Sequence, residues 1–364
     1  MRQFLRVALL AYRGNPYSGG QGVYVRHLSR ALARLGHQVE VLAGPPYPEL
    51  DAGVTLNRLE SLDLYRPEDP FSRARGFRDL VDVLEFGTMC VGGFPEPLTF
   101  SLRAWRELQR RRAAFDLVHD NQSLGYGLLG IERLGLPVVA TIHHPIAIDR
   151  RLELAGAPGW QRRFAIRRWY AFTRMQTRVA PRLRRVITVS DAAQDEIVGE
   201  MGVARERIAV VPNGVDAATF RPRPEQARVE GRLVATASAD VPLKGLVPLL
   251  EALARVRAER RADLVVVGKV RRHGAVAAAI DRLGLTQSVR FVNGIGEAEL
   301  VDLYAQAEVA VVPSLYEGFS LPAVEAMACA VPVVATTAGA LPEVVGRDGR
   351  AGFLVPPGDA PARA

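Results

Sequence analysis

The sequence has very little cysteine. Only two of its 364 residues are cysteines, Cys90 and Cys329, and they lie far apart in the chain. Two isolated cysteines provide no disulfide framework and match no cysteine metal site. We therefore expect a protein of a reducing compartment, the cytosol.

Long apolar runs and metal-ligand patterns are also missing. No hydrophobic stretch approaches the ~18 to 20 residues that a membrane-spanning helix needs. Histidine, cysteine and carboxylate residues nowhere show metal-ligand spacing, and no Asp-x-Asp pair occurs. We expect a metal-independent reaction without a bound cofactor.

Lysine is rare, and arginine carries almost all of the positive charge. The chain has 45 arginines against two lysines, Lys244 and Lys269, and a net charge of +8. Residues 150–185 contain eleven arginines and a single acid, Glu153, interspersed with aromatic residues. This pattern predicts one or two amphipathic helices. One interpretation is a solvated basic face with its aromatic residues in the core, and the other is a surface for anionic lipid or a lipid-linked acceptor. No nucleic-acid-binding module accompanies the segment, so no nucleic-acid partner is expected.

Strand and helix patterns alternate along the chain in two similar halves, and the length suggests two domains. This alternation predicts parallel sheets covered by helices on both faces. We expect an α/β protein with two doubly wound, Rossmann-like domains, residues 1–200 and 201–364, which face each other across a cleft. Ligands in such domains bind beyond the carboxyl ends of the strands. Residues 57–100 are rich in proline, and we interpret them as an irregular elaboration near the cleft without assigned chemistry.

The strands that we expect in the first half are residues 4–12, 38–44, 116–120, 137–144 and 185–190, with a helix over 23–37. In the second half we expect strands within residues 207–216, 231–240, 262–269, 289–294 and 309–314. Helices are expected from residue 246, where four leucines share a face, and over 297–308.

Two glutamates, Glu317 and Glu325, flank a loop that leads from a strand into a helix. Ser320 is placed to cap a helix that starts at about Leu321, and the amides of Phe319, Ser320 and Leu321 are then free to bind an anion. Carboxylates are strong acceptors for sugar hydroxyls. We therefore expect Glu325 to bind a ribose and Glu317 a transferred sugar, as a nucleotide sugar requires. The alternative is that Glu325 only caps the helix and Glu317 is a solvated loop residue.

Further positions have candidate roles. Lys244 lies between a strand and a helix start, where an ammonium can neutralise a diphosphate, and the alternative is a surface lysine before a helix. The glycine-rich residues 18–22 precede a helix and do not have the G-x-G-x-x-G spacing of a dinucleotide site. His143 ends a strand, where histidines are more often structural, and His119, Asp120 and Asn121 are candidates for the acceptor side.

The stretch EGFSLPAVE at 317–325 resembles the E-x7-E motif of the retaining glycosyltransferases of family 4, which have the GT-B fold. The similarity extends through 289–336, through VVPNGVD, and through SGGQG. The resemblance implies that Glu317 and His143 contact the donor hexose, that Glu325 binds the ribose, and that Lys244 binds the diphosphate. It also implies that the loop with Gly20 and Gly22 closes over the diphosphate.

The sequence departs from the family pattern at two places. The arginine of an Arg-x4-Lys pair is replaced by Ala239, so one phosphate contact is missing or supplied from elsewhere. The chain stops after GFLVPPGDAPARA, where family members continue for several helices, so the second domain is expected to be truncated at its C-terminal end.

We expect a retaining glycosyltransferase that moves a hexose from a nucleoside diphosphate sugar, UDP- or GDP-linked, to an acceptor hydroxyl. The base is expected near residues 292–294, with Asn293 as the candidate side chain, and the acceptor is a lipid-linked or small glycoside. The resemblance implies a front-face mechanism without an enzymic nucleophile. The alternatives are a nucleotide-sugar epimerase of the same fold and a non-catalytic protein that binds nucleotide sugars or a membrane. A cytosolic location is expected, with residues 150–185 as a candidate contact to the inner face of a membrane.

Overall fold

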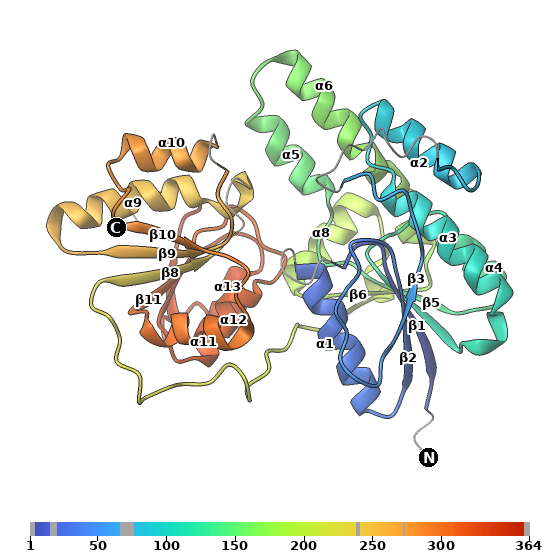
Figure 1. Cartoon of the computed structure of the whole chain (residues 1–364), viewed down its shortest axis with the longest axis horizontal. Coiled ribbons are helices and arrows are strands. Elements are labelled where there is room, and N and C mark those ends of the chain that lie inside the picture. The colour runs from blue at the N-terminus through green and yellow to red at the C-terminus, as the bar shows by residue number, and fades with distance from the viewer. Residues whose placement is uncertain (1–3, 15–19, 66–75, 238–240, 272–273, 360–364) are drawn as a thin grey trace. The chain divides into compact units, whose positions relative to one another are not determined.

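The chain forms two compact units. The computed structural model describes residues 4–14, 20–65, 76–237, 241–271 and 274–359. Unit 1 comprises Met1–Thr188 and Gln194–Val211, and unit 2 comprises Val189–Ala193 and Pro212–Ala364. Each unit is a parallel β-sheet with helices packed against it (Figure 1). None of the helices in the described residues is both long enough and apolar enough to span a bilayer.

Unit 1 contains a seven-stranded parallel sheet in the order β3-β2-β1-β4-β5-β6-β7. The strand order reverses between β1 and β4, and the carboxyl ends of these two strands mark the place where doubly wound sheets bind ligands. After Arg6, every residue of β1 is buried, as a central strand with both faces covered requires. The strands are β1 (Arg6–Ala11), β2 (Gln38–Ala43), β3 (Thr55–Arg58), β4 (Leu117–Asn121), β5 (Val138–Thr141), β6 (Arg185–Thr188) and β7 (Ile208–Val210).

The helices of this part of the chain cover the sheet. They are α1 (Gly20–Arg34), α2 (Leu80–Cys90), α3 (Glu96–Arg110), α4 (Gly127–Arg133), α5 (Ala147–Ala155), α6 (Gly159–Trp169), α7 (Thr173–Val179) and α8 (Asp191–Met201). Short 3-10 turns are η2 (Arg112–Ala114), η3 (Tyr170–Phe172), η4 (Ala180–Arg182) and η5 (Arg205–Arg207).

Three expectations for this region were wrong. Residues 57–100 are not irregular throughout, because the described part of this range holds the end of β3, the whole of α2 and the start of α3. Residues 207–216 do not open the second half, since β7 pairs with β6 in the sheet of unit 1. Helix α1 begins at Gly20, so Gly20 and Gly22 lie in its first turn and not in a preceding loop.

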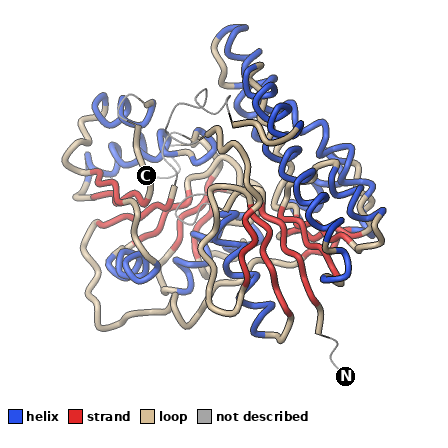
Figure 2. Tube along the Cα trace, turned by 45° about the vertical axis from the view of Figure 1, so that its right-hand side comes forward, coloured by secondary structure: helices blue, strands red, loops and turns tan. Residues whose placement is uncertain are grey.

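Unit 2 contains a six-stranded parallel sheet in the order β10-β9-β8-β11-β12-β13, which reverses between β8 and β11. The expected leucine face of α9 is confirmed, because Leu246, Leu249, Leu250 and Leu253 are all buried. The strands are β8 (Arg232–Thr236), β9 (Asp263–Val267), β10 (Val289–Val292), β11 (Val309–Val312), β12 (Val333–Thr336) and β13 (Gly352–Val355). The helices are η6 (Pro242–Lys244), α9 (Leu246–Glu259), α10 (Ala275–Arg282), α11 (Glu297–Gln306), α12 (Leu321–Ala328) and α13 (Leu341–Val345). Figure 2 shows the helices on the outside of the strands of this sheet.

Candidate functional site

Lys244 lies at the point in unit 2 where the strand order reverses. It ends the 3-10 turn η6, and Gly245 follows in the left-handed conformation with φ of 62°. A Cβ atom on Gly245 would lie 1.9 Å from the carbonyl oxygen of Pro313, directly after β11. The glycine therefore allows the Lys244 turn to pack against the loop that carries Glu317.

The structure brings Lys244 and Glu317 together, although 73 positions separate them in the sequence. Lys244 Nζ donates to Glu317 Oε1 over 2.7 Å, and Ser314 Oγ donates to the same oxygen over 2.7 Å. The side chains of Lys244 and Glu317 are 31% and 12% exposed, so both remain within reach of a ligand. Glu317 Oε1 therefore accepts from an ammonium and a hydroxyl at the same time.

The backbone of the loop at residues 313–320 is held from several sides. Leu315 N donates to Leu243 O over 2.7 Å, and Thr336 Oγ1 donates to Ser314 O over 2.6 Å. Ala340 N donates to Glu317 O over 2.9 Å. These bonds fix the main chain under Glu317, as a preorganised site requires.

Ser320 occupies the N-cap position of α12, but its side chain makes no capping hydrogen bond. Its φ of 89° lies in a region that non-glycine residues rarely adopt, and such strain concentrates at functional sites. The hydroxyl oxygen is buried and has no hydrogen-bond partner among the described residues. The expected capping role is therefore wrong. The helix start at Leu321 and Pro322 in the first turn are confirmed, and the first amides of a helix have no intrahelical acceptor.

Glu325 lies one turn inside α12 in a confined environment. Tyr304 Oη donates to Glu325 Oε2 over 3.3 Å, and the same phenol lies 3.2 Å from Thr236 Oγ1. Burial raises the pKa of the Glu325 carboxyl to about 7, despite the hydrogen bond from Tyr304. A carboxylate with free acceptor positions in this environment is strongly stabilised by hydrogen bonds that ligand hydroxyls donate. Asn293 lies exposed directly after β10, at the edge of the same sheet.

His143 follows β5 in unit 1 and belongs to a fixed cluster. Its Nε2 lies 2.8 Å from Asn121 Oδ1 at the carboxyl end of β4. The ring of Tyr24 contacts the imidazole edge to face at 4.6 Å between centroids. Burial lowers the pKa of His143 to about 3, so the imidazole is neutral at physiological pH. Asn121 Nδ2 is buried and has no partner in the described part of the chain, which leaves a donor next to the imidazole.

Gln122 holds the backbone around His143. Gln122 Oε1 accepts from His143 N over 2.7 Å, and Gln122 Nε2 donates to His144 O over 2.7 Å. Gln122 and Leu124 both have positive φ, of 57° and 48°. This strained turn after β4 positions the loop after β5, which is the role of a rigid scaffold around a reacting group.

The neighbouring candidates are structural. His119 Nε2 lies 2.7 Å from Thr141 Oγ1, and burial lowers the pKa of His119 to about 4. Asp120 is fully buried, accepts from Ser123 Oγ and from Leu124 N, and its pKa is raised by burial to about 6. Both side chains are buried and have partners within unit 1, and a role on the acceptor side stays a prediction.

The glycine-rich segment is described only in part. Gly20 is exposed, and a Cβ atom added there would meet nothing within 4 Å, whereas Gly22 is buried in α1. Ser18 and Gly19 lie outside the described residues, as does Ala239, the departure from the Arg-x4-Lys pair. Among the residues that are described, no group of three or more histidine, cysteine or acidic side chains could hold a metal ion.

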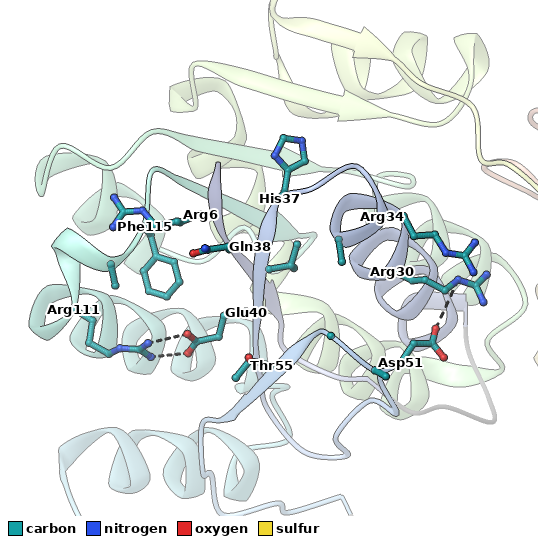
Figure 3. A pocket seen from close by; sticks show the side chains of 15 residues that line it. Arg6, Arg30, Arg34, His37, Gln38, Glu40, Asp51, Thr55, Arg111 and Phe115 are labelled. Carbon is teal, nitrogen blue, oxygen red and sulfur yellow. Dashed lines mark hydrogen bonds and ion pairs between the residues drawn. The ribbon is translucent and has the colours of Figure 1, made fainter. Parts of the chain in front are cut away.

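A hollow of about 890 Å³ lies near the amino-terminal ends of strands in the unit 1 sheet, away from the carboxyl ends described above (Figure 3). Arg6, Gln38 and Thr55, the first residues of their strands, line it together with arginines of α1 and the end of α3. Arg111 pairs with Glu40 over 2.6 Å. Since ligands of this fold class bind at carboxyl ends, and since these charges are paired within the protein, the hollow is not the candidate site.

Sequence reasoning missed the residues that orient the candidates. Tyr304, Gln122 and Tyr24 each contact a predicted site residue from another segment, and Ser314 contacts Glu317 within the same loop. Ser314 and Gln122 follow the carboxyl ends of strands, which is a signal that could have found them. Tyr304 lies on α11 with the spacing of a core residue, and nothing in the sequence distinguishes it.

Residues 18–219 match the family described as Glycosyltransferase Family 4, and residues 230–364 match Glycosyl transferases group 1. The chain is 53% identical over 358 residues to an MMP alpha-(1->4)-mannosyltransferase of Mycolicibacterium hassiacum, covering 98% of this chain and 86% of the relative. It is 32% identical over 391 residues to D-inositol 3-phosphate glycosyltransferase 2 of Catenulispora acidiphila, covering 97% of this chain and 84% of that relative.

Solved structures of similar fold include the sucrose-phosphate synthase of Thermosynechococcus elongatus, with a TM-score of 0.71 at 23% identity over 98% of this chain and 87% of that one. Anabaena HepE in complex with UDP-glucose has a TM-score of 0.66 at 19% identity, over 98% of this chain and 86% of that one. These similarities show the GT-B fold, with two Rossmann-like parallel-sheet domains. The chain therefore belongs to glycosyltransferase family 4 and is a glycosyltransferase.

Proposed function

We propose that the protein transfers a hexose from a nucleoside diphosphate sugar to an acceptor hydroxyl with retention of configuration. The observation that carries this proposal is the cluster of Lys244, Glu317 and Ser314 at the reversal point of the unit 2 sheet. An ammonium and a carboxylate side by side suit a ligand that joins a diphosphate to a sugar. At 53% identity, the mannosyltransferase relative supports mannose as the hexose and an α-(1→4) linkage as the product.

Unit 2 is proposed to bind the donor. Lys244 and the first amides of α12 meet the diphosphate, with Ser320 Oγ as a further donor. Glu317 accepts hydroxyls of the hexose, and Glu325 accepts those of the ribose. Asn293 is the proposed neighbour of the base, which is uracil or guanine. In unit 1, His143 is proposed to contact the hexose, and the helix start with Gly20 and Gly22 to approach the diphosphate.

The described groups around His143 favour a mechanism without an enzymic nucleophile. Two carboxylates near His143 already have partners. Asp120 is fully buried and accepts two hydrogen bonds, and Asp149 Oδ1 lies 3.2 Å from Nε2 of the neighbouring His144. His143 is a neutral hydrogen-bonding group. The bond between C1 and the phosphate oxygen then breaks while the acceptor oxygen bonds to C1 on the same face. The acceptor proton passes to the leaving phosphate oxygen, and Lys244 stabilises the charge that develops on the diphosphate.

The acceptor that we propose is a glycoside, free or linked to a lipid, with unit 1 as its binding domain. We also propose a cytosolic location with residues 150–185 in contact with the inner face of a membrane. The mannosyltransferase relative at 53% identity favours glycosyl transfer over the epimerase and the non-catalytic protein.

The test is an assay of nucleotide release from UDP- and GDP-hexoses with oligosaccharide acceptors, followed by NMR of the product anomer. We expect Lys244→Ala and Glu317→Ala each to lower kcat/KM by roughly 100-fold or more while the fold is kept. Near-normal rates in either variant would contradict the site. A β product from an α-linked donor would contradict retention, and a changed sugar nucleotide without acceptor would identify an epimerase.

A further inference from the structure

Helix α2 exposes its apolar side and buries its acidic side. Leu80 is 80% exposed and Leu84 41%, whereas Asp82 and Glu85 are each 1% exposed. A helix on the surface of a globular protein normally has the opposite arrangement. The exposed apolar side of the helix and its C-cap consists of Leu80, Val83, Leu84 and Val91.

Buried ion pairs fix this orientation of α2. Arg103 Nη2 lies 2.6 Å from Asp82 Oδ1 and 2.5 Å from Glu85 Oε2, and Arg78 Nε lies 2.9 Å from Asp82 Oδ2. Burial opposes ionisation of Asp82, yet the hydrogen bonds from Arg78 and Arg103 outweigh it and lower the pKa to about 2. Rotation of the helix to bury its leucines would leave Arg103 unpaired inside the protein. The exposed apolar side is therefore built into the fold.

Helix α6 presents a second unusual face. Trp160 and Phe164 are 76% and 59% exposed, and Arg163 and Arg167 are exposed beside them at positions i, i+3, i+4 and i+7. Ile166 is the single buried residue of α6. Arg168 Nε donates to Val91 O over 3.1 Å, which joins the end of α6 to the end of α2. Figure 1 shows both helices at the same end of unit 1.

We propose that these two faces form a docking surface for an anionic lipid bilayer. The α2–α6 surface consists of Leu80, Val83, Leu84, Val91, Trp160, Arg163, Phe164 and Arg167. The aliphatic side chains offer no hydrogen bond and require an apolar phase, whereas the arginines require anions. Exposed aliphatic, tryptophan and arginine side chains on neighbouring helices match the acyl chains, interface and headgroups of such a bilayer.

Charge argues against a second copy of the chain as the occupant. Residues 150–185 carry eleven arginines and one acid, so a two-fold contact through this face would oppose two strongly positive fields. The proposal extends the membrane contact of residues 150–185 by the apolar face of α2. It is independent of glycosyl transfer, because lipid binding needs neither donor nor acceptor.

The experiment is co-sedimentation of the whole chain with vesicles of phosphatidylcholine alone or mixed with phosphatidylglycerol. We expect binding to the mixed vesicles and a blue shift of the tryptophan fluorescence, to which Trp160 contributes together with Trp105 and Trp169. The double variants Leu80→Gln with Leu84→Gln, and Arg163→Gln with Arg167→Gln, should each weaken binding by roughly tenfold or more. The matched controls are Leu35→Gln, an exposed leucine of unit 1, and Arg260→Gln with Arg261→Gln in unit 2; both should bind as the unchanged chain does.

Two results would overturn the proposal. One is the absence of binding to the mixed vesicles by the unchanged chain, or binding by both double variants that equals that of the unchanged chain. The other is dimerisation without lipid that the leucine variant abolishes, which would assign the α2 face to a second copy. Circular dichroism of each variant checks that it is folded, and the nucleotide-release assay separates failure of this surface from failure of the proposed function.

Discussion

Replacement of Glu325 by glutamine tests the environment of this half-buried carboxyl. Burial raises its pKa from the ordinary value of 4.5 to about 7, so the folded chain binds a proton that the unfolded chain has released between these pH values. Stability from this group is therefore present at low pH and is lost as the pH rises through about 7. At about 1.4 kcal/mol per pH unit, the full cost is roughly 3 kcal/mol above pH 7.

Glutamine has nearly the same shape and cannot ionise. We expect the free energy of unfolding of Glu325→Gln, relative to the unchanged chain, to rise by up to about 3 kcal/mol from pH 5 to pH 8. Urea unfolding followed by circular dichroism at both pH values measures this difference. Glu230→Gln, an exposed residue of the same unit, is the control and should show no such trend. A difference between variant and unchanged chain that does not depend on pH would refute the reasoning.

Three further changes test other parts of the site. Gly245→Ala should lower the free energy of unfolding by about 2 kcal/mol or more, because the left-handed φ and the contact with Pro313 O exclude a Cβ atom; a thermal melt within error of the unchanged chain would contradict this. Asn121→Ala should lower kcat/KM by about tenfold through the orientation of His143, with donor binding by unit 2 unchanged. Asn121→Asp should raise the pKa of His143 and move the acid limb of the pH–rate profile to higher pH; an unmoved profile would show that the two side chains do not interact.

Local patterns predicted most of the elements, because each strand and helix of a doubly wound domain has its own periodicity. The four leucines at one face of α9 and the loop between β11 and α12 could be located from the sequence in this way. The E-x7-E pattern also located Glu317 and Glu325 relative to the helix start. These features depend on residues that are close together in the sequence, and they can therefore be predicted from it.

Contacts between distant segments could not be predicted. The pairing of Lys244 with Glu317 depends on how β8 and β11 lie side by side, and the contact of Tyr304 with Glu325 depends on the packing of α11 against α12. Helix α2 shows a second limit of prediction from the sequence. Periodicity indicates which residues share a face, but Arg103 on another helix decides that the acidic face of α2 is the buried one.

The most direct test of the donor site is calorimetric titration of the chain with UDP and GDP. The site predicts that one nucleotide binds selectively and that Lys244→Ala abolishes most of the binding. Arg260→Ala removes the same charge at the amino-terminal edge of the sheet, just before β9, and should leave the affinity unchanged. No binding by the folded chain, or equal binding by Lys244→Ala, would contradict the assignment of the nucleotide sugar to unit 2.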